Sequence, residues 1–214
     1  MVRKKKIILL AGPTASGKSK LAVHLAKNLN VDIINADSMQ VYKEISVLSS
    51  RPTSNDLNIA KHHLYGFNSV REAFSTGCWL KMTTNKINQL WSKNRTAIIV
   101  GGTGLYFKAL TDGLVKIPNI PINLRKKIRE LHKKIGQKNF FAKLTKLDPL
   151  VKQFLSPSDS HRSMRAYEVK KFTNKSLFLF ANETKSKFEK KNFKKLFINI
   201  PRGLSHNKVD ERVE

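Results

Sequence analysis

One short segment near the amino terminus restricts the possible folds of this chain more than any other feature. Residues 12–19, Gly-Pro-Thr-Ala-Ser-Gly-Lys-Ser, match the pattern of a phosphate-binding loop, which is Gly, four residues, Gly, Lys and then Ser or Thr. The apolar run Ile7–Ala11 precedes the loop, and apolar residues recur at helical spacing from Ser19 onward. Because a phosphate-binding loop requires a strand before it and a helix after it, we expect a di- or triphosphate group to bind here.

The residue types in this loop suit the binding of a diphosphate and a magnesium ion. Its glycines allow backbone N–H groups to point at phosphate oxygens, and the N-terminus of the following helix adds partial positive charge. Lys18 would bridge phosphate groups, and the hydroxyl of Ser19 can hold Mg²⁺. The predicted phosphate-binding residues are Gly12, Pro13, Thr14, Ala15, Ser16, Gly17, Lys18 and Ser19.

Further apolar runs predict an α/β fold with a parallel sheet. Residues 31–34 and 96–100 are short runs of mostly apolar residues, which is typical of strands that helices cover on both faces. Residues 63–67 predict a further short strand, and residues 79–91 carry apolar side chains at helical spacing. Strands that alternate with helices around a phosphate-binding loop indicate a P-loop NTPase-like core.

A change in composition after residue 114 divides the chain. Prolines mark a linker there, and the residues beyond it are basic and helical in pattern, with a break near Gly136. The run 196–200 predicts a strand that returns to the sheet. We therefore expect the first part of the core over 1–114, a basic helical insertion over 115–190, and the return to the core over 191–214.

The charge of the chain favours a polyanion as its partner. The sequence has 41 Lys and Arg against 15 Asp and Glu, which gives a formal net charge of +26. A surface with this charge attracts nucleic acid strongly. A compositional bias of the genome toward lysine and asparagine would also produce such an excess, so the charge alone does not decide between the two explanations.

Cysteine content and hydropathy favour a cytoplasmic protein with no membrane segment. The single cysteine, Cys78, excludes an internal disulfide and fits a reducing compartment. The run 7–11 follows basic residues as in a secretory signal, but it is too short and a Gly-Pro pair ends it. No other apolar stretch approaches the ~18 residues that would cross a bilayer. We expect a monomer in the cytoplasm.

Asp37 is the carboxylate that follows a predicted core strand. The run 96–100 ends instead in Gly-Gly-Thr-Gly, without the acidic residue that a nucleotide-hydrolysing P-loop protein places after a second strand. Ligands of open parallel sheets bind at the carboxyl ends of the strands, which makes Asp37 a candidate for the active site. The alternative is that Asp37 caps the N-terminus of a helix.

Four motifs in order resemble one known family. They are the loop 12–19, Asn-Ala-Asp-Ser-Met-Gln-Val-Tyr at 35–42, His-His-Leu at 62–64, and Val-Gly-Gly-Thr-Gly-Leu-Tyr at 100–106, with weaker similarity over 159–168. Together they are similar to bacterial tRNA dimethylallyltransferases, which attach an isopentenyl group to N6 of adenosine 37 in tRNA. The catalytic domain of that family continues beyond the position of Glu214, so the resemblance implies a member truncated at the C-terminus, and its activity is open.

The resemblance implies roles for the residues of the predicted site. The loop holds the diphosphate of dimethylallyl diphosphate, so no hydrolytic water has to be organised and a second acidic residue is not needed. Asp37 becomes the base that takes the proton of the exocyclic amine. Lys18, the Thr14 hydroxyl and Mg²⁺ on Ser19 meet the charge of the leaving oxygens, and Arg202 adds a further positive charge.

The resemblance also implies where tRNA binds. In the family, adenosine 37 turns out of the anticodon loop toward the phosphate-binding loop, which is the usual way to expose a base for chemistry. Without the resemblance, the pattern around Arg162 and Arg165 favours the solvated basic face of a helix. The residues implied to contact the anticodon stem-loop are Asp37, Ser38, Met39, Gln40, Thr103, Arg125, His161, Arg162, Ser163, Met164 and Arg165.

Two other functions fit the same residues. One is a small-molecule kinase that uses ATP, because P-loop proteins include kinases as well as other transferases. The other is an inactive homologue that binds tRNA through its basic helices without turnover. Dependence on ATP would favour the first, and salt-sensitive RNA binding without product would favour the second.

Overall fold

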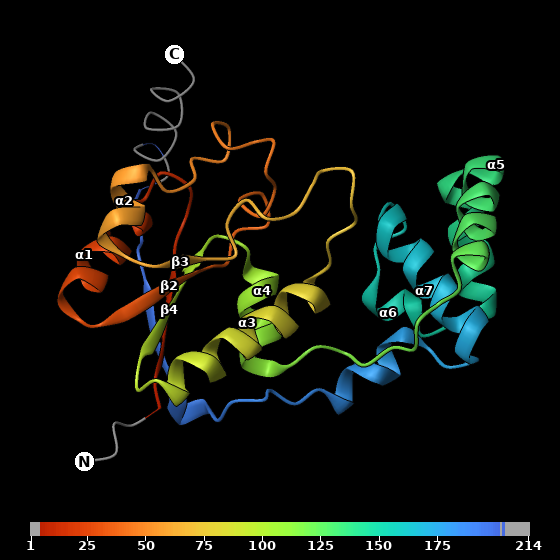
Figure 1. Cartoon of the computed structure of the whole chain (residues 1–214). Coiled ribbons are helices and arrows are strands. Elements are labelled where there is room, and N and C mark those ends of the chain that lie inside the picture. Colours follow the sequence, from red (N-terminus) through yellow and green to blue (C-terminus); the bar gives the residue numbers. More distant parts are fainter. Residues whose placement is uncertain (1–4, 202, 204–214) are drawn as a thin grey trace. The chain divides into compact units, whose positions relative to one another are not determined.

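The computed structural model describes residues 5–201 and 203, and the chain forms two compact units (Figure 1). The sheet unit comprises Met1–Leu114 and Ser186–Glu214, and the helical unit comprises Val115–Lys185. The helical unit begins at residue 115, where the insertion was expected to begin. It ends at residue 185, whereas the insertion was expected to end at residue 190.

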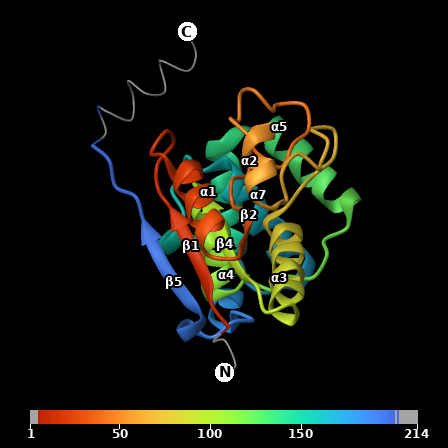
Figure 2. The ribbon, with the colours of Figure 1, turned by 60° about the vertical axis from the view of Figure 1, so that its left-hand side comes forward.

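The sheet unit is built on five parallel strands in the order β3-β2-β4-β1-β5. Figure 2 labels β2, β4, β1 and β5 of this sheet. The expected fold class, an α/β protein with a parallel sheet, is therefore confirmed. The three strands with mostly apolar sequences lie in the middle of the sheet, as their composition predicts. The strands are β1 (Ile7–Ala11), β2 (Val31–Asn35), β3 (His62–His63), β4 (Thr96–Gly101) and β5 (Phe193–Phe197).

The two edge strands differ from the sequence-based prediction. β3 ends after His63, because Leu64 and Gly66 have φ angles of 63° and 54°, which an extended chain does not adopt, so the predicted strand 63–67 is wrong. The predicted strand 196–200 is wrong by three residues, because β5 begins at Phe193, opposite Ile7 of β1. Most of β5 is exposed at the sheet edge, where lysines are tolerated and hydropathy no longer locates a strand.

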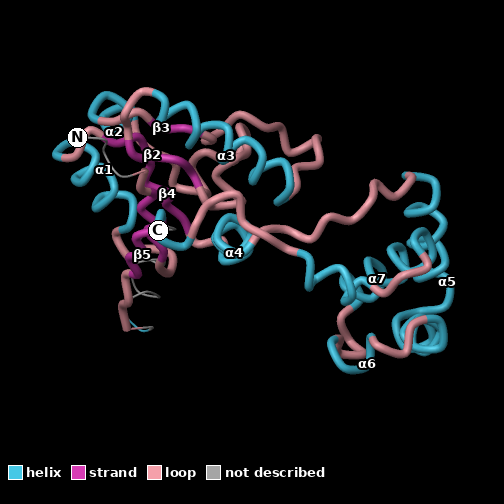
Figure 3. Tube along the Cα trace, turned by 90° about the horizontal axis from the view of Figure 1, so that it is seen from below, coloured by secondary structure: helices cyan, strands magenta, loops and turns pink. Residues whose placement is uncertain are grey.

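Helices cover both faces of the sheet (Figure 3). On one face, α1 (Lys18–Asn28) packs Ala22 and Ala26 against apolar residues of the three central strands. On the other face, α3 (Thr76–Ser92) and α4 (Gly104–Asp112) contribute a second apolar layer around Trp79. The predicted helix 79–91 is thus confirmed, and it starts earlier because the Ser75 hydroxyl caps it by accepting a bond from the Cys78 N–H at 3.2 Å.

One short helix, α2 (Ser54–Ile59), was not predicted from the sequence. Its signal is local: the side chain of Thr53 accepts from the Asp56 N–H, and the Asp56 carboxylate accepts from the Thr53 N–H at 2.9 Å. This reciprocal pair is a capping box, which marks the start of a helix even where no apolar periodicity follows.

The helical unit has its own apolar core, formed by residues such as Phe140, Leu144 and Ala166. Its first helix breaks at Gly136, whose φ of 73° lies outside the helical region, as the sequence predicts. No strand occurs over 115–185, all of which the structure describes. Its elements are α5 (Ile122–Leu147), α6 (Val151–Phe154), α7 (Ser160–Thr173) and the 3₁₀ helix η1 (Leu177–Glu183).

Within the described part of the chain, every helix is too short or too polar to span a bilayer.

Candidate active site

The site lies at the carboxyl edge of the sheet, where β1, β4 and β2 end side by side. Ala11 is opposite Gly101, and Asn35 is opposite Val100, so the segments that follow these strands leave the sheet at the same level. Adjacent strands are about 4.8 Å apart, which places the start of the phosphate-binding loop about 10 Å from the segment that carries Asp37. The strand between them, β4, ends at Gly101, and the backbone of Ala36 packs directly against this glycine.

The phosphate-binding loop has the backbone geometry of an anion site. Gly17 has a φ of 84° and forms the N-cap of α1, so no side chain at this position covers the first N–H groups of the helix. Ala15 also adopts a left-handed conformation, with a φ of 59°. Lys18 is half-buried and its Nζ donates to the Pro13 carbonyl, which keeps the ammonium group inside the curve of the loop. Thr14 and Ser19 are exposed beside it.

The donor set around Ser19 fits a magnesium ion that arrives with a diphosphate. Among the described residues, no three His, Cys, Asp or Glu side chains gather into a group that could hold a metal ion. Mg²⁺ does not require such a group, because it usually keeps several waters and takes its other ligands from substrate phosphates. The exposed Ser19 hydroxyl, in the first turn of α1, can supply the single protein ligand.

Asn35 fixes the backbone of Asp37, a role that sequence reasoning missed. Its side chain is completely buried, and its Oδ1 accepts from the Asp37 N–H at 2.8 Å while its Nδ2 donates to the Asp37 carbonyl at 2.9 Å. The same Nδ2 donates to the Leu64 carbonyl at 3.0 Å. The half-buried Asp37 carboxylate accepts from the Met39 N–H through Oδ1 at 2.9 Å. Residues 38–50 form turns, so the helix N-cap interpretation of Asp37 is wrong.

Thr103, after β4, is joined to the Asp37 segment. Its N–H donates to the Ala36 carbonyl at 3.1 Å, and its Oγ1 accepts from the Ser38 N–H at 2.9 Å. Two sequence motifs that are far apart in the chain therefore form one wall of the site. Of the other predicted residues, Met39 is exposed, and Gln40 donates to the Ser49 carbonyl at 2.7 Å.

Aromatic side chains surround the Asp37 segment, and the sequence analysis did not assign them to the site. Trp79 donates from Nε1 to the Asn35 carbonyl at 2.7 Å, and its ring stacks on Tyr106 with centroids 4.3 Å apart. Burial, with smaller contributions from Tyr42 and the Asp37 charge, raises the pKa of Tyr106 to about 12. Burial and the Asp37 charge also raise the pKa of Tyr65. Both phenols are therefore neutral at physiological pH.

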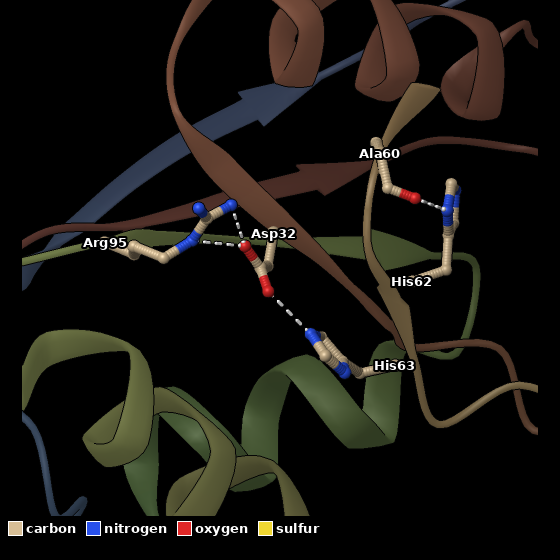
Figure 4. A network of polar contacts seen from close by, with 5 residues as sticks. All are labelled: Asp32, Ala60, His62, His63 and Arg95. Carbon is tan, nitrogen blue, oxygen red and sulfur yellow. Dashed lines mark hydrogen bonds and ion pairs between the residues drawn. The ribbon is translucent and has the colours of Figure 1, made fainter. Parts of the chain in front are cut away.

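A buried ion network accounts for the His-His-Leu motif (Figure 4). Asp32, which is 2% exposed, accepts from Arg95 Nε at 2.7 Å and lies 2.7 Å from His63 Nε2. These bonds fix β3 beside β2, because a buried carboxylate needs its partners. The next residue, Leu64, then presents its carbonyl to Asn35. The motif thus supports the Asp37 segment from outside the site.

The helical unit presents part of the predicted tRNA-binding set. Arg125 on α5 and Arg165 on α7 are half-exposed, and His161 and Arg162 are exposed. Ser163 is completely buried, with its Oγ 3.3 Å from Gln137 Nε2, so its side chain offers no surface to a partner. Met164 packs against the apolar core and Arg202 lies outside the described residues. Successive residues of a helix point in different directions, so on α7 Ser163 is buried while Arg162 and Arg165 lie at the surface.

The comparison of sequences decides the family. A family model described as IPP transferase matches residues 40–214, and the tRNA dimethylallyltransferase of Pelagibacter ubique (strain HTCC1062) is 50% identical over 99% of this chain. The chain belongs to this family. Another similar protein, the tRNA dimethylallyltransferase of Rickettsia massiliae (strain Mtu5), is 44% identical to this IPP transferase over 99% of the chain. The chain spans 68% of the Pelagibacter protein and 59% of the Rickettsia protein.

Solved structures resemble this IPP transferase over almost its whole length. A eukaryotic dimethylallyltransferase acting on tRNA matches 98% of the chain with a TM-score of 0.82 and 27% identity, and the match covers 53% of that protein. The tRNA isopentenylpyrophosphate transferase of Bacillus halodurans matches 98% of the chain with a TM-score of 0.61 and 28% identity, over 65% of that protein. The resemblance inferred from the four motifs, and with it the P-loop NTPase-like fold, is confirmed.

Replacing Gly101 with alanine is expected to destabilise the sheet unit of this IPP transferase. A Cβ atom at Gly101 would lie 2.1 Å from the carbonyl oxygen and carbon of Ala36, so the backbone beside Asp37 must move. Overpacking against backbone costs about 2 kcal/mol, or roughly 5 °C in the melting temperature. Thermal unfolding followed by tryptophan fluorescence reports on this unit, because Trp79 and Trp91 both lie in it.

Gly104→Ala is the matched control for this variant. Gly104 opens α4, and a Cβ atom there would meet nothing within 4 Å. Since alanine favours helix more than glycine does, the melting temperature of Gly104→Ala should be unchanged or slightly raised. Equal melting temperatures for Gly101→Ala and the wild type would show that Ala36 does not approach β4 this closely.

Proposed function

We propose that this IPP transferase transfers a dimethylallyl group from dimethylallyl diphosphate to N6 of adenosine 37 in the anticodon loop of tRNA. The observation that carries the proposal is the placement of two complementary groups at one sheet edge. A phosphate-binding loop follows β1, and a firmly held carboxylate follows β2, with only the glycine end of β4 between them. An allylic diphosphate and an acceptor amine can therefore meet between these groups.

The phosphate-binding loop is proposed to hold the diphosphate of the donor. The N-terminal N–H groups of α1 and the left-handed turns at Ala15 and Gly17 supply donors and partial positive charge. Lys18 adds a full charge, and the Thr14 hydroxyl is exposed next to it. Mg²⁺, held by Ser19 and the phosphate oxygens, would neutralise part of the charge of the diphosphate. Charge of this sign, fixed in place, favours departure of the anionic group.

The proposed reaction forms one bond and breaks one. The N6 nitrogen of adenosine bonds to C1 of the dimethylallyl group, and the C1–oxygen bond to the diphosphate breaks with its electron pair leaving on the oxygen. The proton that N6 loses passes to the Asp37 carboxylate, which acts as the general base. Asn35 and Thr103 hold the Asp37 segment in place, so that the carboxylate need not be ordered during the reaction.

The helical unit is proposed to bind the anticodon stem-loop. Residues 115–185 contain 17 Lys and Arg against five Asp and Glu, so this unit carries a large part of the positive charge of the chain. Contacts of lysine and arginine with phosphates bind RNA with little regard to sequence and weaken steeply with salt. Adenosine 37 would leave the loop stack to reach Asp37. A tRNA substrate is consistent with activity in the cytoplasm.

One incubation tests the proposal. The purified chain is given Mg²⁺, dimethylallyl diphosphate and unmodified tRNA, and the tRNA is digested and examined by mass spectrometry for isopentenyladenosine. Product that requires the allylic diphosphate is the expected result. A reaction that depends on ATP, with no isopentenyladenosine formed, would favour a kinase. Binding of tRNA without isopentenyladenosine would favour an inactive tRNA-binding homologue. Either result overturns the proposal for this chain.

A further inference from the structure

A buried carboxylate connects two arginines in the helical unit. Glu168 on α7 is 5% exposed, although glutamate is rarely buried without partners. Its Oε2 accepts from Arg165 Nη1 at 3.2 Å and lies 3.8 Å from Nε of Arg125, which comes from α5. Both guanidinium groups therefore lie within 3.8 Å of the same oxygen atom, although they belong to different helices.

The Glu168 carboxylate engages only part of the charge and of the N–H donors of the two arginines. Two positive charges face one negative charge, so the cluster retains a net charge of +1. Each arginine side chain is 36% exposed. The buried Nε of Arg125 faces Glu168, so the exposed part of that side chain lies elsewhere along it. Arg165 uses Nη1 toward Glu168, and a guanidinium group has four further N–H donors. Arg165 is thus held by a hydrogen bond to Glu168, and Arg125 lies beside the same carboxylate at ion-pair distance without a hydrogen bond through Nε. Each side chain keeps exposed surface that an anion can reach.

We propose that Glu168 is a positioning residue that holds Arg125 and Arg165 next to each other as a two-pronged site for an RNA phosphodiester. This inference rests on the proposed function, in which tRNA binds the helical unit. Arginine is well suited to the role, because its planar group can donate to a carboxylate on one edge and to phosphate oxygens on another. A pair of guanidinium groups that is ordered before binding loses less conformational entropy when RNA arrives.

The main alternative gives Glu168 a purely electrostatic role, and the two explanations predict changes in RNA affinity of opposite sign. Replacing Glu168 with glutamine raises the net charge of the chain by one. On charge alone, RNA should bind more tightly and with a steeper dependence on salt. If Glu168 positions the arginines, RNA should bind more weakly in spite of the added charge, because the two guanidinium groups repel each other and separate.

The test measures the dissociation constant of the full chain for unmodified tRNA at several salt concentrations. For Glu168→Gln we expect an increase of about tenfold, which is the loss of roughly one charge-assisted contact. The slope of the logarithm of affinity against the logarithm of salt should become shallower by about one. The Michaelis constant for dimethylallyl diphosphate should not change, because the donor binds the sheet unit.

Glu130→Gln is the matched control. Glu130 is an exposed residue of α5, so this variant makes the same change of charge in the same unit without touching the cluster. Its affinity for tRNA should be equal to that of the wild type or slightly higher. Binding of tRNA by Glu168→Gln that equals or exceeds binding by Glu130→Gln overturns the inference. Failure of the wild type to bind tRNA would instead contradict the proposed function.

A second pair of variants decides the matter if Glu168→Gln does not fold. Arg125→Lys and Arg165→Lys keep the charge but replace the planar group with a single ammonium. Positioning by Glu168 predicts that each weakens tRNA binding severalfold at constant net charge, whereas Arg71→Lys, an exposed position in the sheet unit, changes nothing. Wild-type affinity in both cluster variants overturns the inference.

Discussion

Replacing Asp37 with asparagine is expected to lower the rate of dimethylallyl transfer about 10³-fold, within the range that general bases contribute. The asparagine side chain keeps the shape of aspartate and an oxygen for the bond to the Met39 N–H, so the turn should survive. It removes the group that would take the proton from N6. The turnover number should therefore fall while the Michaelis constant for dimethylallyl diphosphate changes little. Timed assays of isopentenyladenosine formation under saturating donor measure this directly.

Asp112→Asn provides the control for Asp37→Asn. Asp112 is an exposed carboxylate at the end of α4 in the same unit, so the chemical change is the same but lies outside the site. Its turnover number should equal that of the wild type. Full activity of Asp37→Asn would contradict the assignment of the base. An equal loss in both variants would indicate a general effect of charge on tRNA binding.

The central part of the fold could be predicted because local sequence and burial agree there. The runs that became β1, β2 and β4 are mostly apolar, with Asp32 as the buried exception in β2, since helices cover both faces of each strand. The phosphate-binding loop carries its own signature, because its backbone geometry restricts residue type. Edge strands lack this agreement. In β5, Lys194 and Lys195 are tolerated because the strand is mostly exposed, so its start could not be found from apolar residues.

The support of the site was harder to predict than its reactive groups. Asp37 could be proposed because it follows a strand, which is a local feature. The role of Asn35 depends on a bond to Leu64, 29 residues away, and on the left-handed turn that presents this carbonyl. Such bonds between distant segments leave no periodic pattern in the sequence. Ser163 shows the reverse error, because a resemblance transfers a run of residues while a helix turns some of them inward.

The structure also limits which groups can share the work of catalysis. Near Asp37, the phenols of Tyr65 and Tyr106 have raised pKa values and stay protonated, so neither can take the proton from N6 at physiological pH. Asp32 is buried among Arg95 and His63 and holds β3 in place. In the proposed reaction, proton removal is therefore assigned to the Asp37 carboxylate, and binding of the diphosphate charge is assigned to the loop after β1.

Replacing Lys18 with alanine is expected to lower kcat/KM for dimethylallyl diphosphate by about 10²- to 10³-fold, the effect of removing one fixed charge from the leaving oxygens. Its ammonium group already donates to the Pro13 carbonyl within the loop, so it is in place before the diphosphate arrives. The substitution should weaken binding of the donor and slow the departure of pyrophosphate. Steady-state assays with varied donor and saturating tRNA separate the two effects.

Lys20→Ala is the control that makes this result specific. Lys20 is an exposed residue on the same helix, two positions further on, and its loss removes the same charge from the chain. Because the helix is phased so that only Lys18 turns into the loop, Lys20→Ala should retain the donor kinetics of the wild type, and both variants should bind tRNA about equally. Unchanged donor kinetics in Lys18→Ala would mean that the diphosphate does not bind in the loop. The reaction would then need another site for its leaving group, and the roles of Asp37 and the loop would have to be assigned anew.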